Sequence, residues 1–77
     1  MKSSNILKSF RGKRLLSQKE VADLLGISRQ VYNKLENNII HCELDLVLKI
    51  LAIFNVDTAE FNEFLNALKQ DYMSYKQ

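Results

Sequence analysis

The sequence predicts one compact all-α domain of five helices over residues 1–77. Three observations favour this class: the chain has no proline, it has only two glycines, and 47% of its residues are hydrophobic. A protein built from sheets needs more of the turn-forming residues than this chain contains. Its length lies near the lower limit for one core that folds without disulfides or metals, so we expect a single domain.

The first helix is expected over residues 4–14. Its inner face is formed by Ile6, Leu7 and Phe10, which recur at helical spacing. Gly12 lowers helix stability by ~1 kcal/mol relative to alanine. It therefore marks either an early end of the helix or a close contact with another helix.

The second helix is expected over residues 18–25. Ser17 is a favourable N-cap, and Glu20, three residues later, can reach back to complete a capping box. Leu15 or Leu16 in the preceding connection can pack against the new helix as a hydrophobic staple. Local residues alone therefore predict where this helix begins.

A third helix is expected over residues 29–36, after a turn at Gly26. Glycine takes positive φ without steric cost, and Ser28 can cap the helix that follows the turn. The predicted inner face consists of Val31, Tyr32 and Leu35, and the outer face of Arg29, Gln30, Asn33 and Lys34. Two helices joined in this way form a helix-turn-helix, whose second helix can enter the major groove of DNA.

The polar face of the third helix suits an anionic, base-bearing groove, because its four side chains all form hydrogen bonds and none is acidic. Arginine and lysine can bond guanine there, and glutamine and asparagine can bond adenine. We therefore expect base readout by Arg29, Gln30, Asn33 and Lys34. Contacts to DNA phosphate are expected from the helix ends, namely from Ser17, Gln18, Lys19, Ser28 and Asn37.

Charge is unevenly distributed along the chain. Residues 1–40 carry eight basic and three acidic side chains, a net charge of +5, whereas residues 41–77 carry three basic and six acidic ones, a net charge of −3. The basic half contains the helix-turn-helix, so the asymmetry favours orientation of that half toward phosphate. The alternative is a dipolar surface that serves only solubility.

The fourth helix is expected over residues 43–54, and its predicted core residues are Leu44, Val47, Leu48, Leu51 and Phe54. The loop before it contains Asn38, which can replace a glycine in the left-handed conformation. The same loop carries Ile39 and Ile40. Together with Leu24 they leave apolar surface that the chain's own C-terminal segment or a protein partner can cover.

The fifth helix is expected over residues 58–72, with Asp57 and Glu60 as its capping box. Its apolar stripe is longer than a domain of this size can bury, and it consists of Phe61, Phe64, Leu65, Leu68 and Tyr72. The extra turn either folds over its own domain or forms a dimer seam of Phe64, Leu65, Leu68 and Tyr72. The dimer is favoured, since two-fold partners match the half-site geometry of helix-turn-helix proteins.

The run Ser-Gln-Lys-Glu-Val-Ala-Asp-Leu-Leu-Gly-Ile-Ser-Arg, followed by Leu-Glu-Asn, resembles the DNA-binding domain of phage repressor and Cro-type (XRE-like) regulators. The resemblance extends from about Ile6 to Phe61, and it implies a lambda-repressor-like fold with double-stranded DNA as the partner. It also implies a structural ion pair between Arg11 and Glu36 that ties the first helix to the third. This chain departs from the family where isoleucines replace basic loop residues and where Cys42 replaces a proline.

No catalytic constellation, cofactor-binding loop or metal-ligand cluster is evident in the sequence, so we expect no enzyme activity, cofactor or metal. The sequence lacks the ~20 apolar residues of a membrane helix, and its single cysteine suits a reducing cytoplasm. The favoured hypothesis is a sequence-specific transcriptional regulator, a small repressor that binds double-stranded DNA as a homodimer. The alternative is a protein-binding adaptor or antitoxin-like module that uses Leu24, Ile39, Ile40 and the fifth helix.

Overall fold

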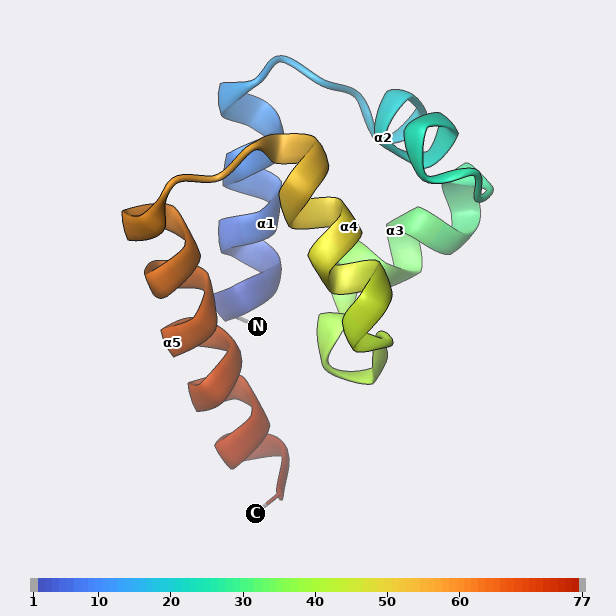
Figure 1. Cartoon of the computed structure of the whole chain (residues 1–77). Helices are drawn as coiled ribbons and strands as arrows, with labels where there is room; N and C mark the ends of the chain where they lie inside the picture. Colours follow the sequence, from blue (N-terminus) through green and yellow to red (C-terminus); the bar gives the residue numbers. More distant parts are fainter. Residues whose placement is uncertain (1, 77) are drawn as a thin grey trace.

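The computed structural model describes residues 2–76, without the side chains of His41, Tyr75 and Lys76. The elements follow in the order α1 (Lys2–Lys13), α2 (Gln18–Leu25), α3 (Arg29–Asn37), a short 3-10 helix η1 (Ile39–His41), α4 (Leu44–Phe54) and α5 (Thr58–Lys76) (Figure 1). This part of the chain contains five α-helices and no strand, which confirms the all-α prediction. None of these helices is long and apolar enough to cross a membrane.

α1 and α5 differ most from their predicted lengths. α1 begins two residues before its predicted range and α5 extends four residues beyond it, while the other α-helices match within one residue. The carboxylate of Asp71 in α5 accepts hydrogen bonds from the backbone N–H groups of Lys2 at 3.1 Å and Ser3 at 2.8 Å. Asp71 thereby caps α1 from another helix, and no local sequence signal announces that cap.

α1, α2 and α4 end in the same way, in the Schellman motif. One residue lies in the left-handed region, and the next N–H donates to a carbonyl five residues back. After α2 the left-handed residue is Gly26, as predicted, with φ of 73°. Leu15 takes this position after α1 with φ of 56°, and Asn55 takes it after α4 with φ of 50°. The closing bonds run from Leu16 to Arg11, from Ile27 to Ala22 and from Val56 to Leu51.

Asn38 and Gly12 were singled out for their backbone, and the prediction for Asn38 is wrong. Asn38 has φ of −150° and does not take the left-handed conformation, because η1 follows it directly and turns the chain instead. Gly12 lies inside α1, and apart from the neighbouring backbone of the helix itself no atom stands within 4 Å of the position that a Cβ would occupy there. Gly12 therefore makes no close contact with another helix, and α1 ends one residue after it, at Lys13.

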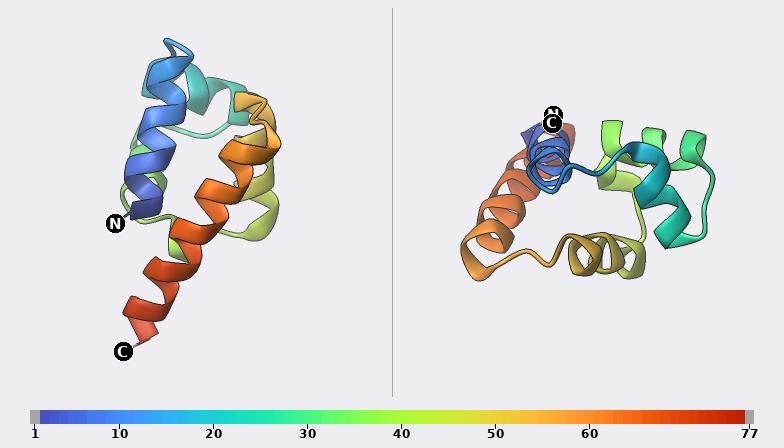
Figure 2. Two further views of the ribbon diagram at one scale, coloured as in Figure 1. Left: turned by 90° about the vertical axis from the view of Figure 1, so that its left-hand side faces the viewer. Right: turned by 90° about the horizontal axis from the view of Figure 1, so that it is seen from above.

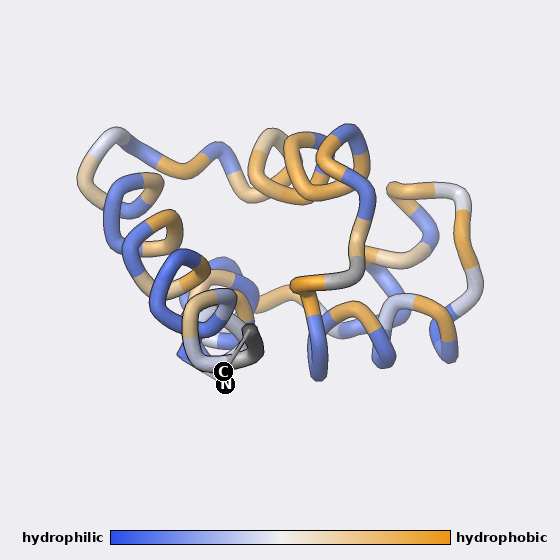
Figure 3. The backbone as a smooth tube through the Cα atoms, turned by 90° about the horizontal axis from the view of Figure 1, so that it is seen from below, coloured by the Kyte–Doolittle hydropathy of each residue, from blue (hydrophilic) through white to orange (hydrophobic). Residues whose placement is uncertain are grey.

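The core lies inside a ring of helices. α1 packs chiefly against α5, and α2 packs against both α3 and α4 (Figure 2). Figure 3 shows hydrophobic residues on the inner side of α3 and hydrophilic residues on its outer side. The buried core residues are Leu7, Phe10, Val21, Ala22, Tyr32, Ile39, Val47, Ile50, Leu51, Phe54 and Phe64.

The packing face of α4 differs from its prediction. Leu44 is 71% exposed and Leu48 is also exposed, whereas Ile50, which the prediction omitted, is buried. The helix is apolar around most of its circumference, so its sequence does not define which side faces the core. The prediction for α3 is also wrong at one position, since Val31 is exposed while Tyr32 is buried.

Ile39 and Phe64 are buried in the core, at 1% and 0% exposure. Ile39 was expected to form apolar loop surface, but η1 turns it inward against the other helices. Phe64 was expected in a dimer seam, but it packs beside Phe10 with the ring centroids 6.4 Å apart. Phe64 therefore presents no surface to a partner, and Ile39 presents almost none.

Arg14 joins α1, α4 and α5, a role that no pattern in the sequence indicates. Its guanidinium pairs with Glu60 at 2.9 Å and donates to the backbone carbonyls of Phe10 and Phe54. It also lies 5.7 Å and 5.8 Å from the ring centroids of the same two phenylalanines. Glu60 completes the predicted capping box, since its N–H donates to Asp57 Oδ1 at 2.7 Å and its Oε1 accepts the Asp57 N–H at 3.2 Å.

Replacing Leu15 with glycine should stabilise the domain. The left-handed conformation costs an L-residue ~1–2 kcal/mol, and this side chain contributes little packing because it is 89% exposed. Glycine is also more flexible in the unfolded chain, so we expect a net gain of up to about 1 kcal/mol in the free energy of unfolding. Urea melts measure it.

Leu15→Ala is the matched control for this prediction. Alanine removes the same exposed side chain but keeps the backbone strain, so its stability should stay near that of the original chain. If the glycine variant is no more stable than the alanine variant, the left-handed residue carries no strain.

Candidate nucleic-acid interface

The side chains predicted to read bases lie together on the outer face of α3. Arg29, Gln30, Asn33 and Lys34 are all exposed. With Gln18 at the start of α2, they line a polar depression of about 420 Å³. The depression brings the beginning of α2 and the exposed side of α3 into one surface.

Local caps fix the start of both helices. Ser17 Oγ accepts the Glu20 N–H at 3.0 Å, and Glu20 Oε1 accepts the Ser17 N–H at 2.9 Å, which completes the predicted capping box. Ser28 Oγ accepts the Val31 N–H at 3.1 Å. Of the two leucines proposed as a staple, Leu16 packs against the core and Leu15 does not.

Arg11 and Glu36 form a bidentate ion pair beneath this surface. Arg11 Nε donates to Glu36 Oε2 at 2.9 Å, and Arg11 Nη2 donates to Glu36 Oε1 at 3.0 Å. A third Arg11 donor, Nη1, bonds the Leu16 carbonyl at 3.0 Å. The pair connects α1 to the last turn of α3, with Glu36 completely buried.

Glu36 is ionised despite its burial. Desolvation alone would raise its pKa, but the hydrogen bonds from Arg11 and Gln18 outweigh that effect and lower the pKa overall. The same pairing raises the pKa of Arg11. Tyr32, which is buried beside the pair, has its pKa raised above the usual range mainly by desolvation and also by Glu36, so its phenol stays neutral.

A chain of amide hydrogen bonds leads from this ion pair to the outer face of α3. We call this surface the reading face, because it carries the side chains predicted to read bases: Arg29, Gln30, Asn33 and Lys34. Gln18 Nε2 donates to Glu36 Oε1 at 3.0 Å. Asn33 Nδ2 then donates to Gln18 Oε1 at 3.2 Å, and Asn37 Nδ2 donates to Asn33 Oδ1 at 3.3 Å. We refer to Glu36, Gln18, Asn33 and Asn37 as the amide relay.

The relay changes how two expected phosphate contacts are understood. Gln18 and Asn37 were predicted to contact DNA phosphate, but the side chains of both form hydrogen bonds within the protein. Of the other candidates, Ser17 and Ser28 serve as caps through their hydroxyls. The ammonium of Lys19 pairs with Asp23 at 3.0 Å on the surface.

Less basic charge reaches the surface than the sequence count suggests. Arg11 is neutralised by Glu36, and Arg14 by Glu60 from the other half of the chain. By contrast, the side chains of Arg29, Gln30 and Lys34 make no hydrogen bond or ion pair within the described residues. Among the described side chains, the cations without an acidic partner are Arg29 and Lys34 on α3, three lysines of α1 (Lys2, Lys8 and Lys13) and Lys69 on α5.

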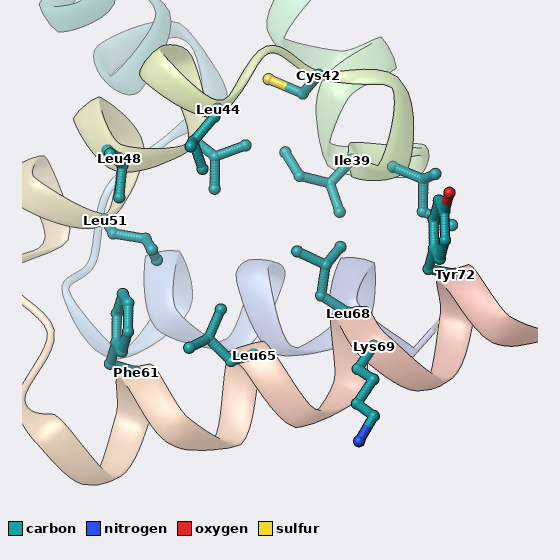
Figure 4. Close-up of a pocket in the computed structure, with 12 residues that line it drawn as sticks. Ile39, Cys42, Leu44, Leu48, Leu51, Phe61, Leu65, Leu68, Lys69 and Tyr72 are labelled. Carbon is teal, nitrogen blue, oxygen red and sulfur yellow. The ribbon is translucent and has the colours of Figure 1, made fainter.

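The side chains of the expected dimer seam are not on one surface. Phe64 is in the core, whereas Leu65, Leu68 and Tyr72 line an apolar groove of about 510 Å³, in which Leu65 lies on the side of α4 and Leu68 points toward Ile39 of η1 (Figure 4). Leu44 and Leu48 form the opposite wall. Ile39, Ile40, Cys42, Val47, Leu51, Phe61 and Lys69 complete the lining. The groove shares no residue with the polar depression.

Comparison with known proteins supplies one match. A family model described as helix-turn-helix matches residues 7–61, from the first helix to the first turn of α5. Neither the curated proteins nor the solved structures gave a match. The matched range contains Arg11, Glu36 and the four side chains of α3 that are predicted to read bases.

Breaking the Arg11–Glu36 pair should destabilise the domain strongly. Removing one partner of a buried pair leaves the other charge without compensation, which costs ~3–5 kcal/mol. We therefore expect Arg11→Met and Glu36→Gln each to lower the free energy of unfolding by about that amount in urea melts. Lys19→Met is the control, because the exposed Lys19–Asp23 pair should contribute less than ~1 kcal/mol.

The pH dependence gives a second test of the same pair. Because the pKa of Glu36 is lower in the folded state than in the unfolded chain, its stabilisation is present above the unfolded value of about 4.3 and is lost as the pH falls through the folded value. Glu36→Gln should show a weaker loss of stability in that acid range. An acid titration as steep as that of the original chain would contradict the assignment.

Proposed function

This chain belongs to the helix-turn-helix family of phage repressor and Cro-type regulators, and on that premise we propose that it is a small repressor that reads duplex DNA with α3 as a two-fold dimer. The family binds DNA and regulates transcription. The observation that carries the proposal is the outer face of α3. There, the side chains of Arg29, Gln30 and Lys34 make no hydrogen bond or ion pair within the described residues. The buried Arg11–Glu36 pair beneath this face holds α3 in place.

The chemistry of that face suits the major groove. Arg29 and Lys34 are donors for guanine O6 and N7. Gln30 and Asn33 each carry an amide that can form two hydrogen bonds with one adenine, at N6 and N7. Arg29 and Gln30 stand in the first turn of α3, the end of a recognition helix that contacts base edges. We therefore propose that Arg29 and Gln30 each select one base pair.

Phosphate contacts in this proposal come mainly from backbone and charge at the helix starts. The N-terminal N–H groups of α2, including the backbone N–H of Gln18, form an anion site, with the side chains of Ser17 and Lys19 at its edge and Ser28 at the start of α3. Lys19 can exchange its exposed partner Asp23 for a phosphate at little cost, since such surface pairs are weak.

Selection of bound sequences from a random duplex pool tests the proposal directly, because it detects binding and returns the site together. We expect one recovered sequence with two related half-sites. We also expect affinity to fall steeply with salt, as release of counterions from DNA requires. Recovery of no sequence, with no salt-dependent binding, would favour the adaptor hypothesis.

Gln30→Ala should relax preference at one base pair of the recovered site. Each good bidentate contact is worth ~1–3 kcal/mol of discrimination, so specific affinity should fall about tenfold or more while affinity for random DNA stays nearly unchanged. Titration of matched and single-substituted duplexes measures this. Lys19→Ala is the contrasting control, because loss of a phosphate contact should weaken binding to all sequences and reduce the salt slope by about one.

We propose that the dimer forms through the apolar groove between α4 and α5. Leu65 is 43% exposed and faces the exposed Leu44 and Leu48, so the groove presents connected apolar surface to water. Such surface commonly marks an association site. Burying this apolar surface would stabilise the dimer by about 25 cal/mol per Å². DNA would stabilise it further by holding the two α3 helices about 34 Å apart.

Leu65→Glu should disperse the dimer and leave the domain folded, because this side chain is outside the core. We expect a lower mass in sedimentation and loss of cooperative binding to two half-sites. Leu24→Glu is the matched control, since Leu24 is 64% exposed on α2 and does not line the groove. An unchanged mass and footprint for Leu65→Glu would move the dimer contact to another surface.

A further inference from the structure

We propose that Gln18 is a positioning residue that, under the control of Glu36, sets which way Asn33 presents its amide to DNA. The inference rests on the proposed function for its effect on base readout, although the positioning itself is a property of the free protein. The amide relay connects the two residues to the buried carboxylate, and in it the direction of each hydrogen bond determines the direction of the next.

The first step is the carboxylate of Glu36. It is ionised and already accepts two hydrogen bonds from Arg11, at 2.9 Å and 3.0 Å. An ionised carboxylate can only accept hydrogen bonds. The end of the Gln18 amide that lies 3.0 Å from Glu36 Oε1 must therefore be the NH₂ group.

The second step follows from the shape of the amide. With its NH₂ turned toward Glu36, Gln18 has only its oxygen left to face Asn33, at 3.2 Å. An oxygen needs a donor, so Asn33 must turn its own NH₂ toward Gln18. The Asn33 oxygen then faces Asn37, which donates to it at 3.3 Å. One buried charge thus decides the direction of three amides.

The hydrogen-bonding groups of Asn33 that the relay leaves free are those that can contact DNA. The Asn33 amide retains one free N–H on the side of Gln18 and one free oxygen lone pair on the side of Asn37. Adenine offers N7 as an acceptor beside N6 as a donor. Asn33 can therefore bond an adenine whose N7 lies toward Gln18 and whose N6 lies toward Asn37, and the reverse orientation would need the amide to flip against the relay.

The positioning can be measured without DNA, from the order parameter of the Asn33 side-chain NH₂ group by ¹⁵N relaxation. We expect a rigid group, with a value near the ~0.85 of ordered backbone, in the original chain. In Gln18→Met, whose thioether has no donor for Glu36 and is only a weak acceptor for Asn33, the order parameter should fall below ~0.6. Gln30→Met is the matched control. It also replaces a glutamine on this surface with methionine, but Gln30 takes no part in the relay.

The effect on readout is measured with the site recovered from the random pool. Gln18→Met should reduce discrimination at the base pair under Asn33 on the order of tenfold and leave affinity for random DNA nearly unchanged. A uniform loss of affinity for all sequences would show that Gln18 acts as a phosphate contact instead, and would overturn its positioning role.

The two arms separate the inference from the proposed function. If the Asn33 amide is equally rigid in Gln18→Met, or already mobile in the original chain, the relay does not position it, whatever the protein binds. If the amide behaves as expected but no duplex is bound, the relay stands and DNA readout fails. Urea melts of both methionine variants check that the domain remains folded.

Discussion

The reading face depends on one constraint, which is that a charged carboxylate without access to water must be surrounded by donors. Glu36 meets it with Arg11 from α1 and Gln18 from α2, so three helices are held at fixed angles around one group. A pair of this kind adds little net stability relative to an apolar substitute. Its value here is geometric, because α3 cannot tilt without leaving a buried charge unsatisfied.

The molecule separates two kinds of surface. The polar depression combines the start of α2 with the outer face of α3, and the apolar groove lies between α4 and α5. Arg14 holds α5 to the end of α4 through Glu60 and the Phe54 carbonyl. The groove therefore belongs to a braced part of the fold, and a partner bound there would leave the reading face uncovered.

Much of the fold could be predicted because its signals are local. The capping boxes, the turn at Gly26 and the polar side of α3 depend on residues within four positions of one another. Two errors arose where local signals are ambiguous. α4 is apolar on nearly every side, and η1 turns Ile39 inward where a surface loop was expected.

The rest of the site depends on residues far apart in the sequence. The Arg11–Glu36 pair was expected only through the family resemblance, since no spacing rule connects residues 25 positions apart. The roles of Arg14 and of the amide relay were missed for the same reason. Gln18 and Asn33 are unremarkable polar residues until folding brings them within 3.2 Å.

The contact between Asp71 and the start of α1 has a consequence for how the chain is made. A ribosome adding 5–20 residues per second reaches residue 71 roughly 3–14 s after residue 2. During that interval the first turn of α1 has no cap, and Phe10 has no Phe64 to pack against. The nascent first helix therefore lacks this cap until the last helix has been made, and a chain that stops before Asp71 lacks it permanently.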